Sequence, residues 1–117
     1  MTPLRTSVTL EGGVAELLVT PALYGVAKRK KIDLQSDLDA GDVFALYTKV
    51  MYCAAICAWD VASVDESRGE FPYKYADFYT WAATHPDEFG EKIKFIVFAL
   101  TGKEMETKEV KKNAGPR

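Results

Sequence analysis

The chain has 117 residues, of which 48% are hydrophobic and 27% are charged, and its formal net charge is -2. A chain of this length forms one domain and can bury about two thirds of its unfolded surface. We therefore expect a core that needs no metal or disulfide. Domains that bind nucleic acid through its phosphates usually carry positive charge or a strongly basic face, so the overall charge disfavours that class.

Neither a signal peptide nor a membrane span is expected. The first ten residues, MTPLRTSVTL, lack an apolar stretch that leads to a small-residue cleavage site. The longest uninterrupted apolar run covers ten residues, Val50 to Trp59, whereas a membrane-spanning helix needs about 20. The run therefore predicts a buried core helix in a cytoplasmic protein.

The N-terminal segment SVTLEGGVAELLV predicts a β-hairpin. Apolar and polar residues alternate on both sides of Gly12-Gly13, a pair that tolerates positive φ in a tight turn. A short helix starting at Val14 is the alternative. Because an isolated hairpin is only marginally stable, we expect this one to pack on helices or on another subunit.

About four helices are expected after the hairpin. The first begins at Thr20-Pro21, where Thr can cap the helix and Pro suits its first position. A long central helix covers about residues 42–64, with Asp42 as its cap. A third helix covers about residues 74–84. The last begins at Pro86 and ends at Gly102.

The predicted fold is mainly α, a small single-domain helical bundle of about four helices with an N-terminal β-hairpin. The globular domain is expected to cover residues 1–103. From Lys103 onward eight of the fifteen residues are charged, which predicts a solvated charged tail over residues 104–117.

The central helix indicates packing rather than chemistry. Its apolar residues recur with helical spacing at Val43, Leu46, Tyr47, Val50, Ala54, Cys57 and Val61. Cys53 and Cys57 share one face of it, but a zinc site needs four ligands, so we expect buried thiols. The only histidine, His85, has no nucleophile or acid at motif spacing. We expect neither enzyme activity nor a cofactor.

Lys28, Arg29, Lys30 and Lys31 form a basic run at the end of the first predicted helix. Cations are favourable in the last turn of a helix, where they meet the negative end of its dipole. The aspartates that follow offset the charge locally. We expect a solvated helix end, with a partner-docking patch and a nucleic-acid site as the alternatives.

The segment FPYKYADFYTW holds six of the fourteen aromatic residues of the chain. In the core interpretation Tyr75, Phe78 and Tyr79 face inward, and Tyr73 and Trp81 seal the edge. Tyr and Trp are also enriched at the centres of protein interfaces. A mixed role in core and interface is therefore the alternative.

Three segments resemble the tail assembly chaperones of long-tailed bacteriophages and their prophages. They are VTLEGGVAELLVTPAL at the front, LYTKVMYCAAICA in the middle, and YADFYTWAATHPDEFGEKI followed by ALTGKE near the end. Together they span about residues 7–104. The shared pattern is a hairpin, a short helix, a long apolar helix, an aromatic helix and a final helix ending in Gly-Lys.

The resemblance implies a role in binding. Such chaperones coat the tape measure protein, a long apolar helical ruler, keep it soluble and help recruit tail tube subunits. They act in the bacterial cytoplasm and are absent from the mature virion. Coating a long partner also implies self-association. Many relatives occur in two lengths through ribosomal frameshifting, and Lys111-Lys112-Asn113 can be encoded by a slippery run of adenines.

The candidate partner-binding residues come from the basic run, the aromatic segment and the tail. They are Lys28, Arg29, Lys30, Tyr73, Tyr75, Tyr79, Trp81, Lys103, Lys108 and Lys111. Two other functions stay open. One is a small phage or bacterial nucleic-acid-associated regulator that uses residues 28–31, and the other is a structural subunit retained in the virion.

Overall fold

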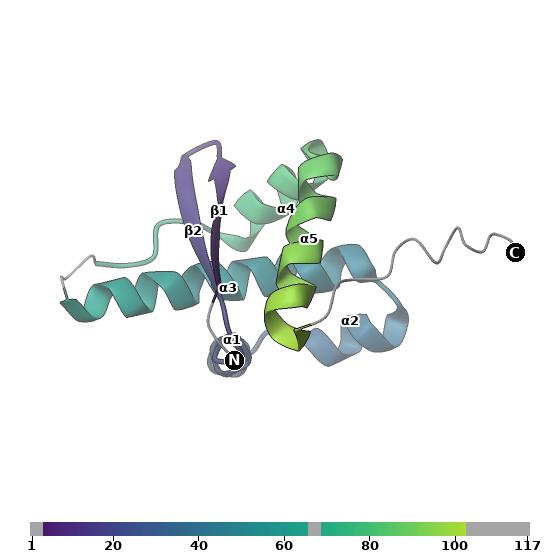
Figure 1. Cartoon of the computed structure of the whole chain (residues 1–117), viewed down its shortest axis with the longest axis horizontal. Coiled ribbons are helices and arrows are strands. Elements are labelled where there is room, and N and C mark those ends of the chain that lie inside the picture. Colours follow the sequence, from purple (N-terminus) through teal and green to yellow (C-terminus); the bar gives the residue numbers. More distant parts are fainter. Residues whose placement is uncertain (1–3, 66–68, 103–117) are drawn as a thin grey trace, which may run out of the picture.

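The computed structural model describes residues 4–65 and 69–102, which form two strands and five helices (Figure 1). In chain order these are β1 (Leu4–Leu10), β2 (Gly13–Val19), α1 (Leu23–Arg29), α2 (Leu34–Ala40), α3 (Val43–Asp65), α4 (Tyr75–Thr84) and α5 (Pro86–Thr101). The prediction of a mainly α protein with an N-terminal hairpin is confirmed. The predicted count of about four helices is wrong, because α2 was not anticipated.

The N-terminal hairpin forms as predicted, so the alternative of a helix from Val14 is wrong. β1 and β2 pair antiparallel in one continuous register, from Leu4 opposite Val19 to Leu10 opposite Gly13. One face of the hairpin is apolar and packs on the helices, because side chains alternate between the two faces of a strand. Its buried residues are Val8, Leu10, Ala15, Leu17 and Val19.

The hairpin turn depends on a glycine at position 13. Gly13 has a φ of 143°, and a Cβ there would lie 2.7 Å from the hydroxyl oxygen of Tyr73. Gly13→Ala should therefore lower the free energy of unfolding by about 1–3 kcal/mol. Gly25→Ala is the control, because nothing lies within 4 Å of a Cβ at that site in α1. It should raise stability by up to about 1 kcal/mol.

Urea unfolding of the two variants checks this pair of predictions. The protein with alanine at 13 should unfold at lower urea, and the protein with alanine at 25 at the same or higher urea. Equal shifts in the same direction would contradict this account of the turn.

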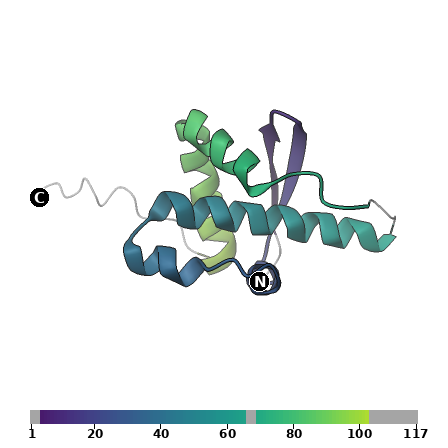
Figure 2. The same cartoon turned by 180° about the vertical axis from the view of Figure 1, so that it is seen from behind.

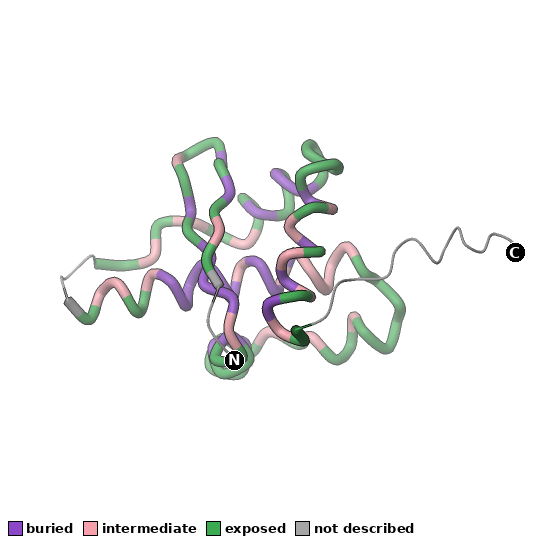
Figure 3. Tube along the Cα trace, in the orientation of Figure 1, coloured by how far each residue is buried: buried purple, intermediate pink, exposed green. Residues whose placement is uncertain are grey.

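α3 is the central helix of the fold, as the sequence predicted. It contacts β2, α1, α2 and α4 and runs the length of the molecule (Figures 1 and 2). Residues 53–58 are buried without interruption, so the middle of the helix is covered on every side (Figure 3). By length and composition, Val43–Val64 could also cross a membrane, but half of its most apolar window is already buried inside this fold.

α1 begins later than predicted. Its first residue is Leu23, and Thr20 acts through its backbone carbonyl, which accepts a hydrogen bond from the Leu23 amide at 2.9 Å. No side chain caps this helix. Lys28 and Arg29 occupy the last turn of α1, as expected, whereas Lys30 is the C-cap and Lys31 follows it.

α2 is a short helix with clear end signals. The Asp33 side chain accepts a hydrogen bond from the Ser36 amide at 2.9 Å, and Gly41 ends the helix in a left-handed conformation. No residue within α2 is fully buried. Its partly buried Leu34 packs against the core, and the Asp37 carboxylate forms an ion pair of 2.7 Å with the Lys49 ammonium of α3, two side chains that are mostly covered.

Breaking this ion pair should loosen α2. Lys49→Met leaves the Asp37 carboxylate without its cation and should cost about 1–2 kcal/mol of unfolding free energy. The hydrogen bond to Asp37 raises the pKa of Lys49 above its ordinary value of 10.5. A lysine with a raised pKa contributes its full stabilisation below the unfolded value and loses it as pH rises through the folded one.

The stability difference between wild type and Lys49→Met should therefore stay constant from about pH 7 to 9. It should shrink above about pH 10.5, where the ammonium loses its proton. Denaturant titrations across this pH range measure the stability difference. A difference that disappears near pH 8 would contradict the prediction.

α4 and α5 complete the core. Within α4 the buried residues are Phe78, Trp81 and Ala82, so the prediction that Tyr79 faces inward and Trp81 only seals the edge is wrong. α5 begins at Pro86 and is capped by Gly102 in a left-handed conformation, as predicted. Lys92 of α5 donates a hydrogen bond to the Thr6 hydroxyl of β1 at 2.6 Å and ties the last helix to the hairpin.

Candidate partner-binding surface

The main candidate site is an apolar groove of about 370 Å³ on one side of α3. α1, α2 and the C-terminal end of α5 lie on this side, below α3 in Figures 1 and 2. We call it the α2 groove. It is lined by Tyr24, Leu34, Gln35, Leu38, Leu46, Tyr47, Val50, Val97, Leu100 and Thr101.

Four helices build the α2 groove from residues that helical spacing brings together. α1 contributes one residue, Tyr24, and α2 contributes residues one turn apart, while the rest of the lining comes from α3 and α5. Leu38 is 58% exposed and Tyr24 is 53% exposed. These two large side chains therefore present apolar surface that the described part of the chain leaves uncovered.

One tyrosine of the groove, Tyr47, is held neutral by its surroundings. Burial raises the pKa of Tyr47 above 10.0, and the nearby Tyr24 hydroxyl raises it further. The Tyr47 hydroxyl is therefore protonated at physiological pH. The groove offers aliphatic anchors together with hydroxyl and amide groups at its margin, which is the composition of a protein-binding groove.

The basic run lies at the end of α1, and one of its members is already paired. The guanidinium of Arg29 binds the Asp60 carboxylate of α3 at 3.1 Å. This partner lies 31 residues away, not among the aspartates that directly follow the run. Lys28 and Lys30 are exposed. The run thus combines one structural ion pair with solvent-exposed lysines.

The aromatic segment is mostly internal. Trp81 is only 5% exposed, and its ring stacks on His85 with centroids 5.5 Å apart. The Tyr73 hydroxyl donates a hydrogen bond to the Val14 carbonyl at 3.3 Å, which ties the segment to the hairpin. Tyr75 is half-buried, while Tyr79 is 47% exposed and contacts Phe44 with ring centroids 4.9 Å apart.

The structure does not bring the predicted site residues together. α1, which carries the basic run, and α4, which carries the aromatic residues, lie on opposite sides of α3 (Figures 1 and 2). Lys103, Lys108 and Lys111 lie outside the described residues, as does the predicted tail over residues 104–117.

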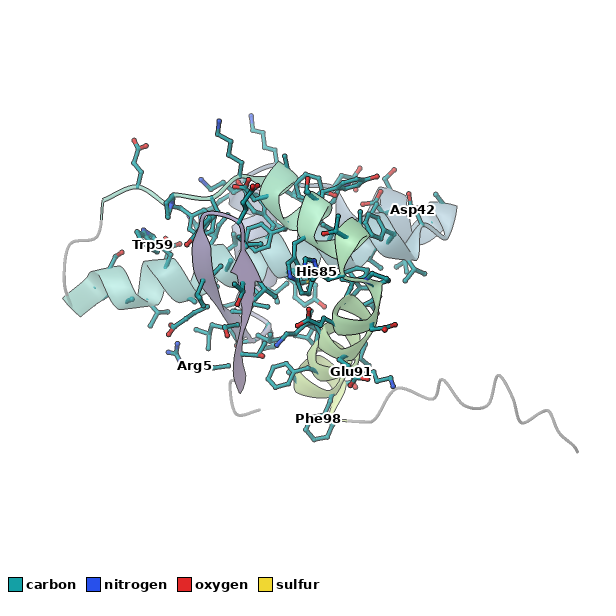
Figure 4. All side chains as sticks on the ribbon, turned by 90° about the horizontal axis from the view of Figure 1, so that it is seen from above. Arg5, Asp42, Trp59, His85, Glu91 and Phe98 are labelled. Carbon is teal, nitrogen blue, oxygen red and sulfur yellow. The ribbon has the colours of Figure 1, made fainter. Side chains whose placement is uncertain are left out.

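Two other clefts are less suited to a large apolar partner. A notch of about 250 Å³ between β2, α3 and the segment before α4 is smaller than the α2 groove, and the predicted site residue Tyr73 lines it together with Trp59 and Phe71. A cleft of about 410 Å³ beside the hairpin turn is polar, with Glu11, Asp77 and His85 at its margin. Figure 4 shows His85 where α4 meets α5.

The described residues contain no group of three or more His, Cys, Asp or Glu that could hold a metal ion. Both cysteines of α3 are buried. Burial raises the pKa of Cys53 to about 11 and also raises that of Cys57. Thiols in this state are protonated at neutral pH and behave as small apolar side chains.

Comparison with protein-family models, curated proteins and solved structures finds no match to this chain.

Sequence reasoning missed the exposed anchors of the α2 groove. Tyr24 and Leu38 were not predicted as site residues, and Leu46 was expected only as a packing residue of the central helix. The signal that could have found the groove is the segment IDLQSDLDAG. Its Asp33 cap, its leucines four apart and Gly41 together define a helix with one apolar side.

Proposed function

We propose that this protein is a phage tail assembly chaperone that acts by binding and not by catalysis. Its partner is the tape measure protein, and the α2 groove holds an apolar stripe of that long helix. Chaperoning keeps the ruler soluble in the bacterial cytoplasm while tail tube subunits are recruited. The protein itself is absent from the finished virion.

The observation that carries this proposal is the open apolar groove with exposed Leu38 and Tyr24 at its walls. A groove between helices is a common way to hold the apolar face of another helix, read through anchors at i, i+3, i+4 and i+7. The resemblance of the sequence to tail assembly chaperones supplies the identity of the partner. Several copies side by side would be needed to cover a long ruler.

Co-expression with the tape measure protein of the same genome tests the proposal. We expect a soluble complex that co-purifies, whereas the tape measure protein alone should aggregate. If the ruler stays insoluble and this protein elutes alone, the proposal fails. Salt-dependent binding to DNA or RNA through the exposed lysines at 28 and 30 would then indicate the nucleic-acid regulator instead.

A further inference from the structure

Two of the four helices that build the α2 groove, α1 and α2, carry opposite charge. On the α2 side, residues 33–42 include four aspartates and no basic residue. Asp37 is neutralised by Lys49. Asp39 lies one turn after the groove residue Gln35 and accepts a hydrogen bond from its side-chain amide at 2.8 Å. An exposed carboxylate therefore stands beside the α2 wall.

The α1 wall has the opposite sign. Lys28 lies one turn after Tyr24 and on the same side of α1, since residues four apart are neighbours on a helix. Lys30 and Lys31 follow at the end of α1, and both are exposed. Lysines thus lie beside the α1 contribution to the groove, and aspartates lie beside the α2 contribution.

We propose that the α2 groove selects an amphipathic helix whose apolar stripe is flanked by basic residues on one side and acidic residues on the other. The basic flank lies against α2 and meets Asp39, and the acidic flank lies against α1 and meets Lys28. Reversing a helix in the groove exchanges its flanks. The charges of the walls therefore also set the direction in which the partner helix runs.

This inference rests on the proposed function, because it describes the helix that the groove accepts. Apolar contacts supply most of the affinity in such a groove, and complementary charge supplies choice among partners. Like charges placed opposite each other disfavour the wrong helix. Substitutions of the charged residues leave the apolar anchors unchanged, so the two contributions to binding can be tested separately.

Three synthetic helical peptides of 18 residues test the inference on the full-length protein. All carry the same leucine stripe; one has lysine and glutamate flanks, one has two lysine flanks and one has two glutamate flanks. Fluorescence anisotropy should show the mixed peptide binding about five-fold tighter than either of the others, because each of the others replaces one partly exposed ion pair by a like-charge contact. In 1 M salt this preference should disappear.

Reversing a single charge in the protein should change which of the three peptides binds most tightly. Lys28→Glu should make the peptide with two lysine flanks the best ligand, and Asp39→Lys should favour the one with two glutamate flanks. Glu70→Lys is the matched control, because Glu70 is exposed and does not line the groove. It should leave the ranking as in the wild type.

Equal affinity for all three peptides would overturn the inference while leaving the proposed function intact, since the apolar stripe alone would then suffice. If no peptide binds, both the proposed charge preference and the binding role of the groove are contradicted. Co-purification with the tape measure protein still decides the proposed function in that case.

Discussion

Phe78→Ala is expected to lower the free energy of unfolding by about 3–5 kcal/mol, the usual cost of removing a buried phenylalanine ring. Phe78 is fully buried, and its ring centroid lies 5.7 Å from that of Tyr52 on α3. The variant leaves a cavity where α4 packs on the central helix. Its melting temperature should fall by roughly 12 °C or more.

The neighbouring residue Tyr79 provides the matched control. Its ring is about half exposed and makes edge-to-face pairs with Phe44 and Tyr75. Tyr79→Ala should cost about 1 kcal/mol, the scale of a surface aromatic pair. Similar losses at 78 and 79 would contradict the orientation of α4 in this fold.

The second large effect concerns the groove. The double change Tyr24→Ser with Leu38→Gln should weaken binding of the tape measure protein about 100-fold, since an interface anchor is worth on the order of 1.4 kcal/mol or more. Both side chains are more than half exposed, so the fold should survive. Circular dichroism and a thermal melt establish that the variant is folded before binding is measured.

Val14→Gln with Val64→Gln is the control for this experiment. These valines are 60% and 83% exposed and do not line the α2 groove. Replacing them removes a similar amount of exposed apolar surface elsewhere. If both double variants bind the ruler equally well, or equally poorly, the groove is not the binding site.

The sequence predicted most of the secondary structure because local signals were strong. Gly12-Gly13 marked the hairpin turn, and Pro86 and Gly102 marked both ends of α5. The continuous apolar run from Val50 to Trp59 identified the buried middle of α3. In each case the backbone preference of one residue, or an uninterrupted pattern, decides the local structure without help from distant contacts.

α2 was not predicted, because its seven residues contain only two leucines among mainly polar and charged residues. The segment from Lys28 to Asp42 was interpreted as a basic run with local counter-charges. In the structure Arg29 pairs with Asp60 and Asp37 pairs with Lys49. Asp60 and Lys49 both belong to α3. Partners at such separations depend on the tertiary fold, so sequence spacing does not identify them.

The orientation of α4 shows a different limit. Residues three and four apart share a helix face, so several adjacent faces of YADFYTWAAT are apolar. The contacts of Trp81 with Phe89 and His85, and of Phe78 with Tyr52 and Tyr73, decide which face is buried. The α2 groove could not be predicted for the same reason, because its lining comes from four separate helices that only the tertiary fold brings together.

The most direct test of the central claim is site-specific photo-crosslinking in the co-expressed complex. A benzophenone side chain at position 38 places the probe in the α2 groove, and one at position 64 places it at the far end of α3. We predict a crosslink to the tape measure protein from position 38 and none from position 64. A crosslink from position 64 alone, or from neither in a complex that co-purifies, would contradict binding in the groove.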